Sequence, residues 1–305
     1  MAGRDFQERG NGPGLVVGGD SLVGSAIQLH CREAGIPVEI SSRRLGTKGV
    51  LFDLRDPDFA HIERTRYEFA FICAAVTDMR ACQDEPELTR QVNVANTIEL
   101  MRRLADRGTH LLFLSSSQVF DGETAAPTED APTCPKNEYG AQKLAVEEAI
   151  VRHELPAAIL RPTKILASHP VGIFKAWFDA LGKGQSIQAA TNLPISPVTV
   201  EDVARAAVLL AAGRHRGVWH LGASDEMTYF EAARLMAERQ QLPQALVKGE
   251  ALTEAQVPSI YRHRHATLSS RKIVQALDMP LRRARDVLAM LFAHFPPSVA
   301  ASGNG

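Results

Sequence analysis

Three polar side chains stand at a spacing that suits the reduction of a carbonyl group. Tyr139 and Lys143 are four residues apart in a predicted helix, so both project from one face, and Ser116 directly follows an apolar run that predicts a strand. A hydride that reaches a ketone carbon leaves negative charge on the oxygen, which then needs a proton donor and hydrogen bonds. We predict Tyr139 as the donor, Lys143 as the cation that lowers the pKa of Tyr139, and Ser116 as the residue that holds the substrate oxygen.

A glycine-rich turn precedes a predicted helix near the start of the chain. The run Gly18-Gly19-Asp20-Ser21-Leu22-Val23-Gly24 follows an apolar strand pattern and leads into helical spacing. A helix N-terminus presents unpaired N–H groups and partial positive charge, which hold a pyrophosphate. Gly18 allows the tight turn, Gly24 allows close helix packing, and Ser21 replaces the middle glycine of the dinucleotide-binding pattern while adding a hydroxyl. A purely structural glycine turn is the alternative.

Basic residues follow the second predicted strand, where NAD-binding proteins carry an acid about 20 positions after the glycines. The chain reads Ser41-Ser42-Arg43-Arg44 there. Two guanidinium groups can grip a 2′-phosphate in paired hydrogen bonds, so the sequence predicts NADP(H) rather than NAD(H), with Lys143 at the nicotinamide ribose. A solvated basic turn is the alternative.

Apolar runs that alternate with helical patterns predict an α/β fold, a Rossmann-like doubly wound parallel sheet with a smaller, mainly helical C-terminal substrate-binding part. Strands are expected at 15–17, 38–40, 50–52, 69–73, 110–114, 157–160 and 218–221, and helices at 24–34, 92–105, 139–151, 174–181 and 200–212. A Thr228-x-x-Glu231 capping box and Ser269 predict two more helix starts. We expect a dinucleotide-binding domain at 14–165, to which 196–222 returns, and a substrate-binding part at 223–295 with 166–195.

Composition excludes several classes of function. The chain has 305 residues with 34 Lys and Arg against 35 Asp and Glu, so no overall positive field attracts nucleic acid or an anionic membrane. No signal-peptide pattern or long apolar run is present, and we expect a cytoplasmic protein that binds neither nucleic acid nor membrane. The four cysteines have neither zinc nor disulfide spacing, so no metal is predicted. Arg262-His263-Arg264-His265 is interpreted as an exposed basic loop, Glu147-Glu148 as a solvated helix face, and the polar ends 1–13 and 296–305 as mobile.

Together these residues resemble the extended short-chain dehydrogenase/reductase family, and within it the dTDP-4-dehydrorhamnose reductase-like group of sugar-nucleotide enzymes. Val119-Phe120-Asp121-Gly122 matches the V-F-D-G of this group, where epimerases and dehydratases usually carry V-Y-G, and so favours a reductase. The resemblance runs from about Leu15 to Leu291 and includes, in the order of the family, Phe52-Asp53-Leu54, Cys73-Ala74-Ala75-Val76-Thr77, Val92-Asn93-Val94, Leu160-Arg161-Pro162, Ser196-Pro197-Val198 and Glu201-Asp202-Val203-Ala204.

The resemblance extends the expected binding sites. It implies that Asp53 contacts the adenine and that the loop at 73–77 lines the cofactor. The expected cofactor-binding residues are Gly18, Asp20, Ser21, Leu22, Val23, Gly24, Ser42, Arg43, Arg44, Asp53, Leu54, Ala74, Ala75, Thr77, Asn93, Tyr139, Lys143, Pro162 and Thr163. The expected substrate-binding residues are Thr77, Ser117, Gln118, Lys164 and Arg264, the last of which would approach a nucleotide diphosphate.

The chain departs from the rhamnose reductases beside the substrate. Ser115-Ser116-Ser117-Gln118 stands where they read S-T-D-Y, and Lys164 stands where they usually carry a Trp near the sugar. The expected function is therefore an NADPH-dependent reductase of a keto-sugar nucleotide of the 4-dehydro-6-deoxy type, with the exact sugar left open. The alternatives are an epimerase or dehydratase of the same family and a non-catalytic NADP-binding regulatory subunit. A homodimer is compatible with this fold, and the sequence does not decide it.

Overall fold

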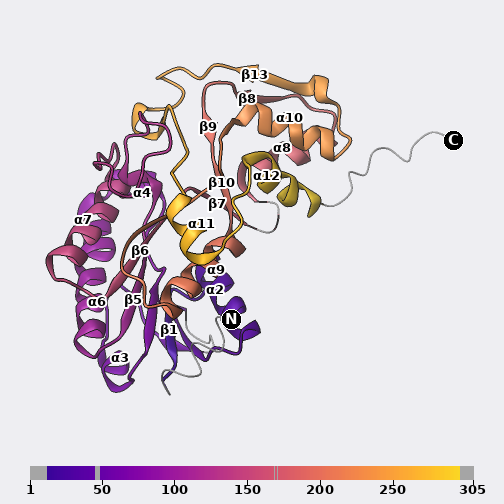
Figure 1. Ribbon diagram of the computed structural model, residues 1–305. Coiled ribbons are helices and arrows are strands. Elements are labelled where there is room, and N and C mark those ends of the chain that lie inside the picture. The colour runs from indigo at the N-terminus through magenta and orange to yellow at the C-terminus, as the bar shows by residue number, and fades with distance from the viewer. Residues whose placement is uncertain (1–11, 45–48, 168, 170, 296–305) are drawn as a thin grey trace.

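A parallel sheet with helices on both faces forms the larger part of the molecule (Figure 1). The computed structural model describes residues 12–44, 49–167, 169 and 171–295, so residues 1–11 and 296–305, which the sequence predicts to be mobile, lie outside the description. In spatial order the strands are β11 (Gly217–Leu221), β6 (Ala157–Pro162), β5 (His110–Leu114), β4 (Phe69–Ile72), β1 (Gly14–Val17), β2 (Val38–Ser42) and β3 (Val50–Leu51). All neighbouring pairs are parallel.

The strand order reverses between β1 and β4. The chain runs outward from β1 to β2 and β3, then crosses back to β4 on the opposite side of β1. Loops leave the carboxyl ends of β1 and β4 in opposite directions, which opens the crevice where doubly wound sheets bind ligands. The predicted fold class, a Rossmann-like doubly wound parallel sheet, is confirmed.

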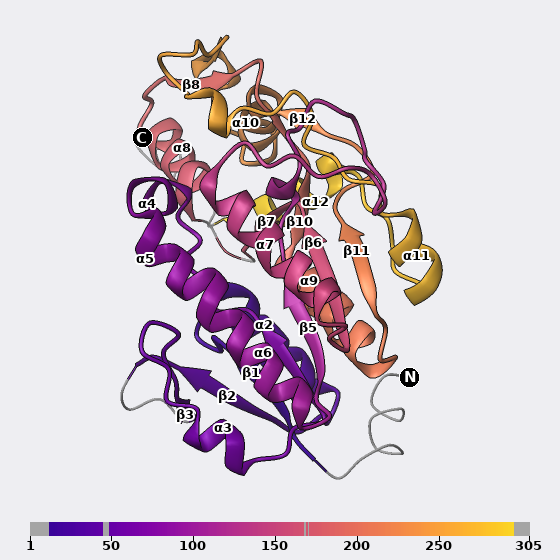
Figure 2. The same cartoon turned by 90° about the vertical axis from the view of Figure 1, so that its left-hand side faces the viewer.

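Two helical layers bury the sheet because its central strands are apolar on both faces. On one face α2 (Leu22–Glu33) packs against α9 (Val200–Ala212), and their apolar residues share a core with Val16 and Phe71. On the other face α6 (Thr97–Asp106) and α7 (Glu138–Arg152) pack over Leu111 and Ile159, with α3 (Ala60–Arg64) at the edge (Figure 2).

A second apolar core forms a smaller lobe at the top of Figure 1. Trp177, Phe178 and Phe292 lie in this core, and Phe174 stacks on Tyr229 with ring centroids 6.2 Å apart. The lobe consists of the helices α8 (Gly172–Gly182), α10 (Tyr229–Arg239) and α12 (Ala284–Ala293) and the short strands β8 (Ile187–Ala190), β9 (Pro194–Ile195), β12 (Met227–Thr228) and β13 (Val247–Glu250). The parallel pair β7 (Lys164–Leu166) and β10 (Pro197–Thr199) connects it to the sheet.

Several elements differ from the sequence-based expectation. The predicted helix 92–105 is two helices, a π-helical segment Gln91–Asn96 followed by α6, and Thr97 Oγ1 donates to Val92 O five residues earlier at 2.9 Å. Ser269 is not a cap: Ser270 precedes α11 (Arg271–Leu277), and its hydroxyl accepts from Gly222 N instead. The short helices α4 (Met79–Asp84) and α5 (Pro86–Arg90) were not predicted.

The predicted division of the chain into a dinucleotide-binding domain and a substrate-binding part stays a prediction. The division places α11 in the substrate-binding part, whereas Ile273 of α11 packs into the core of the large sheet. No described helix is both long and apolar enough to span a lipid bilayer.

Candidate active site

A cavity of about 490 Å³ lies at the carboxyl ends of β5 and β6, between the sheet and the smaller lobe. Leu114, Ser116 and Tyr139 line it from the side of the sheet, and Ile195 and Tyr229 line it from the smaller lobe. A cavity between two lobes can bind a ligand that has two chemically different halves.

Helix geometry brings Ser116 and Tyr139 together. Ser116 follows β5 and caps a short 3₁₀ helix (Ser117–Val119), with its hydroxyl accepting from Gln118 N at 3.2 Å. Tyr139 stands in the first turn of α7, which Asn137 caps by accepting from Gly140 N at 2.8 Å. The two elements touch because residue 140 is glycine: a Cβ there would lie 2.1 Å from the Gln118 carbonyl oxygen. A hydrogen bond joins the side chains of Ser116 and Tyr139.

Lys143 lies one turn further along α7 and is buried in the same cavity wall. Its Nζ donates to Leu114 O at 2.8 Å and lies 5.7 Å from the centre of the Tyr139 ring. Burial lowers the pKa of Lys143 to about 8, although Cys73 and Glu147 act in the opposite direction. The predicted triad of Ser116, Tyr139 and Lys143 is therefore assembled in one place.

The pKa of Tyr139 is raised in this structure. Burial raises it above the ordinary value of tyrosine, Cys82 adds to the rise, and the hydrogen bond with Ser116 opposes it. The Lys143 ammonium lies 5.7 Å from the centre of the Tyr139 ring, and a lowering of this pKa by Lys143 stays a prediction. The same ammonium donates to the Leu114 carbonyl. The raised pKa keeps the phenol protonated in this structure and makes it a weaker acid than an exposed tyrosine.

The glycine turn has the shape that a pyrophosphate requires. A Cβ on Gly18, whose φ is +84°, would lie 2.9 Å from the Ala74 backbone, and one on Gly24 would lie 2.2 Å from Gly18 O. Ser21 caps α2 by accepting from Gly24 N at 3.1 Å, which leaves its hydroxyl proton for a ligand. The Thr163 hydroxyl, also in the cavity wall, is buried with no hydrogen-bond partner among the described residues. These residues fit a dinucleotide.

The end of β2 is tied to the glycine turn by a charged pair. Arg44 Nε lies 3.2 Å from Asp20 Oδ2, and Arg44 N donates to Ser42 Oγ at 3.0 Å. Arg43 and Arg44 are exposed, whereas Ser42 is buried. A 2′-phosphate at this position would share Arg44 with a carboxylate, a competition that the sequence did not predict.

Asn93 positions the cofactor loop rather than facing the cavity. It is buried, its Oδ1 accepts from Val76 N at 2.7 Å, and its Nδ2 donates to Val76 O at 2.9 Å and to Gln142 Oε1 at 2.6 Å. Both polar groups of the amide are thus engaged on the 73–77 loop and on α7.

Asp53 and Leu54, two other predicted cofactor residues, accept hydrogen bonds within the protein. Asp53 follows β3 and accepts from Arg55 N at 3.0 Å through Oδ1. Leu54 is buried, and its carbonyl accepts from Asn96 Nδ2 at 2.6 Å. Of the predicted cofactor residues, the cavity wall contains Ser21, Leu22, Val23, Thr77, Tyr139, Lys143, Pro162 and Thr163. It does not contain Gly18, Asp20, Gly24, Ser42, Arg43, Arg44, Asp53, Leu54, Ala74, Ala75 or Asn93.

Four of the five predicted substrate residues line the cavity: Thr77, Ser117, Gln118 and Lys164. Arg264 does not, and its side chain is exposed. His263 and His265 line the cavity instead. The interpretation of 262–265 as an exposed basic loop is thus wrong for the two histidines.

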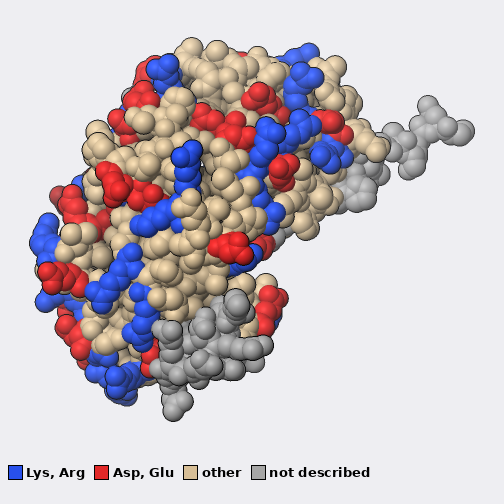
Figure 3. Space-filling model, viewed as in Figure 1, with Lys and Arg blue, Asp and Glu red and all other residues tan. Residues whose placement is uncertain are grey.

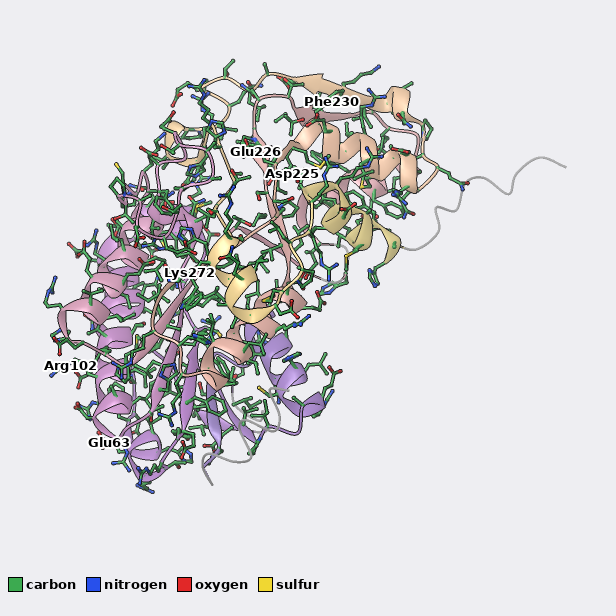
Figure 4. The ribbon with its side chains drawn as sticks, in the orientation of Figure 1. Glu63, Arg102, Asp225, Glu226, Phe230 and Lys272 are labelled. Carbon is green, nitrogen blue, oxygen red and sulfur yellow. The ribbon has the colours of Figure 1, made fainter. Side chains whose placement is uncertain are left out.

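Two acidic side chains of the smaller lobe hold the C-terminal segments (Figure 4). Glu226 accepts from Ala266 N at 2.6 Å and lies 3.0 Å from His265 Nδ1. Asp225 accepts from Ala284 N at 2.6 Å at the start of α12. Glu226 therefore holds the segment at His265 and Ala266, and Asp225 holds the start of α12.

Glu147 is not on a solvated face, contrary to the sequence-based interpretation. It is buried beneath the triad, where Arg161 Nε donates to its Oε1 at 3.0 Å and Ser115 donates to the same oxygen. The sequence also missed Tyr229 and Tyr261 in the cavity wall. The Thr228-x-x-Glu231 capping box was the available signal for Tyr229, because it places that residue in the first turn of a helix.

Comparison with known proteins agrees with this architecture. The family model of the RmlD substrate binding domain matches residues 14–296. Methionine adenosyltransferase 2 subunit beta of Rattus norvegicus is 27% identical over 271 residues, covering 85% of this chain and 80% of that protein. The dTDP-4-dehydrorhamnose reductase of Mycobacterium tuberculosis is 28% identical over 252 residues, covering 79% and 82%.

Solved structures share the fold. The dTDP-4-dehydrorhamnose reductase of Bacillus anthracis, in complex with NADP, superposes with a TM-score of 0.80 at 17% identity, covering 94% of this chain and 100% of that one. With the family model matching residues 14–296, the chain belongs to the RmlD substrate-binding domain family, the dTDP-4-dehydrorhamnose reductase-like group of the extended short-chain dehydrogenase/reductases.

Proposed function

We propose that the protein is an NADPH-dependent reductase of a keto-sugar nucleotide. The observation that carries the proposal is the convergence of Ser116, Tyr139 and Lys143 in one cavity between the two lobes. Relatives named dTDP-4-dehydrorhamnose reductase, one of them in complex with NADP, support the choice of substrate class and cofactor. The 4-dehydro-6-deoxy form of the sugar is the finer part of the proposal.

Each residue of the triad has a distinct role in the proposed reaction. NADPH supplies the hydride when it is bound. Ser116 and Tyr139 direct their hydroxyls at the ketone oxygen, and Tyr139 transfers its proton as negative charge develops there. Lys143 holds the nicotinamide ribose and lies near enough to stabilise the phenolate left after the transfer, since its Nζ is 5.7 Å from the ring. The glycine turn at the start of α2 holds the pyrophosphate.

Lys164 is proposed to face the substrate. Its side chain is exposed and lines the cavity, at the position where the rhamnose reductases usually carry a Trp. An ammonium in place of an apolar ring favours a charged substituent or a phosphate on the bound sugar nucleotide.

The decisive experiment is turnover by the Tyr139→Phe variant. Loss of the hydroxyl removes the proton donor, so turnover with a keto-sugar nucleotide should fall by about 10²-fold or more, while NADPH affinity measured by fluorescence stays close to that of the wild type. Full turnover in this variant would remove Tyr139 from the mechanism. Conversion of the sugar without net consumption of NADPH would instead assign the site to an epimerase or dehydratase.

A non-catalytic NADP-binding subunit is the second candidate. It is favoured by the likeness to methionine adenosyltransferase 2 subunit beta, which covers 85% of this chain. This function requires the glycine turn but not the Tyr139 hydroxyl. NADPH binding with no consumption across a panel of keto-sugar nucleotides, together with a co-purifying partner protein, would support it over the reductase.

A further inference from the structure

The imidazole of His263 lies between two backbone segments at the substrate side of the cavity. Its Nδ1 is 3.1 Å from Asp121 O, and its Nε2 is 3.1 Å from Gln118 Oε1. The ring packs directly on Gly122, whose φ is +73°, and a Cβ there would lie 2.4 Å from Nδ1. Only a glycine at the last position of the V-F-D-G motif leaves room for the His263 ring in this position.

The orientation of the neighbouring amides is determined by the cap of α7. Gly140 N donates to Asn137 Oδ1, so the amide nitrogen of Asn137 must point the other way, toward Gln118 Oε1 at 2.8 Å and Ile260 O at 3.2 Å. Gln118 consequently presents its oxygen, not its nitrogen, to both Asn137 and His263. Both nitrogens of the His263 ring thus face oxygen acceptors.

We propose that His263 is a positioning residue that ties the substrate-side segment around Ile260–His265 to the N-terminus of the catalytic helix α7, and that this tie is complete only when both ring nitrogens carry protons. A neutral ring has one donor, so either its bond to Asp121 or the bond to Gln118 is lost, unless Gln118 turns its amide and breaks with Asn137. Because Asn137 caps the helix that carries Tyr139 and Lys143, the tie links this part of the cavity wall to the catalytic side chains.

Charged groups around the ring act in both directions. Burial lowers the pKa of His263, and Lys136 lowers it further, whereas the Asp121 carbonyl, the Asp121 carboxylate and Glu123 raise it. Lys136 Nζ is itself 2.5 Å from Glu123 Oε1. Arg264, the residue after His263, also lowers the pKa of Glu123 through its charge. Since the pKa is below the ordinary value of 6.5, the ring gains its second proton, and the tie is completed, as the pH falls below that value.

The first test is the pH dependence of KM for the sugar nucleotide, and it rests on the proposed reductase function. In the wild type, KM should rise about three- to tenfold as the pH is raised to about 7.5 from the most acidic pH at which the protein stays folded, the effect of one lost hydrogen bond, while kcat changes less. His263→Gln should remove this dependence. His265→Gln is the matched control, because His265 lines the same cavity but pairs with Glu226, and it should keep the slope. A flat profile in the wild type, or the same slope in His263→Gln, would overturn the proposal.

The second test needs no turnover and measures the His263 ring by NMR in histidine-labelled protein. Asn137→Ser keeps a capping oxygen for α7 but removes the amide donor, so Gln118 is free to turn its nitrogen to the neutral ring and the pKa of His263 should fall. Gln118→Glu places a carboxylate against Nε2 and should raise it. Unchanged titration in both variants would refute the tie. The expected shifts in a protein without reductase activity would refute the proposed function alone.

Discussion

At the scale of single residues, we expect the charged pair between Arg44 and Asp20 to influence the cofactor preference. Arg44 reaches from the end of β2 to the glycine turn, with Nε 3.2 Å from Asp20 Oδ2. A carboxylate in this turn repels a 2′-phosphate, while the guanidinium attracts it. We therefore expect the balance between the two side chains to affect how strongly NADPH is preferred over NADH.

Opposite effects are expected for the two partners. If Arg44 binds the 2′-phosphate as expected, Arg44→Ala removes that charge-assisted hydrogen bond, and the Kd for NADPH should rise about tenfold or more with a smaller change for NADH. Asp20→Asn should tighten NADPH binding, because Arg44 no longer pairs with a carboxylate. Isothermal calorimetry with both cofactors measures the two preferences. Equal weakening of NADPH and NADH in Arg44→Ala would contradict this role.

Close approach of α7 to the 3₁₀ helix after β5 assembles the triad at the scale of elements. Tyr139 and Lys143 come from α7, whereas Ser116 comes from the end of β5. Only a glycine at 140 allows the two segments to touch, since a Cβ would collide with the Gln118 backbone rather than with a flexible side chain. The helix period places Tyr139 and Lys143 on one face, but this contact places them beside Ser116.

Gly140→Ala should separate the two elements. The added methyl forces a backbone shift that costs about 1–3 kcal/mol, measured by urea denaturation, and turnover should fall because Ser116 and Tyr139 move apart. Gly182→Ala, at the end of α8, is the matched control: a Cβ there meets no heavy atom within 4 Å, so stability should stay the same or rise slightly. A fully active Gly140→Ala variant of unchanged stability would refute the role of this contact.

A buried charged network connects the strands and helices at the scale of the whole molecule. Arg161 on β6 binds Glu147 on α7, and its Nη1 lies 3.3 Å from His220 Nε2 on β11. Burial first, then the charge of Arg161, lowers the pKa of His220 to about 3. His110 at the start of β5 is also buried, and burial and nearby arginines lower its pKa to about 4.

On the surface, basic and acidic side chains are interspersed on the face shown in Figure 3, in keeping with a net charge of −1.

These two histidines make the fold sensitive to acid. Their folded-state pKa values lie below the ordinary 6.5, so the unfolded chain binds more protons, and stability is lost as the pH falls from about 6.5 toward 4. Each contributes a loss on the order of 3 kcal/mol at about pH 4. His220→Gln and His110→Gln should flatten this part of the stability curve, measured by denaturation at several pH values. The control His153→Gln, at an exposed position, should leave the slope intact, and an unchanged slope in both buried variants would contradict the assignment.

Local pattern was sufficient for most of the larger part of the fold. The strands at 110–114 and the helix at 200–212 have the predicted bounds, and the glycine turn lies where its spacing indicates. The π-helical segment at Gln91–Asn96 was not predictable, because its register is set by hydrogen bonds of Asn93 to a distant loop and to α7. Burial of Glu147 likewise depends on Arg161, a partner on another element.

The sequence by itself determined the doubly wound sheet, the glycine turn and the residue types of the triad, because apolar periodicity and turn chemistry act over a few neighbouring residues. Only the tertiary structure decided that burial raises the pKa of Tyr139, that Asp20 pairs with Arg44, and that His263 rather than Arg264 faces the cavity. Desolvation and pairing depend on what distant segments bring to a side chain, and no local pattern contains that information.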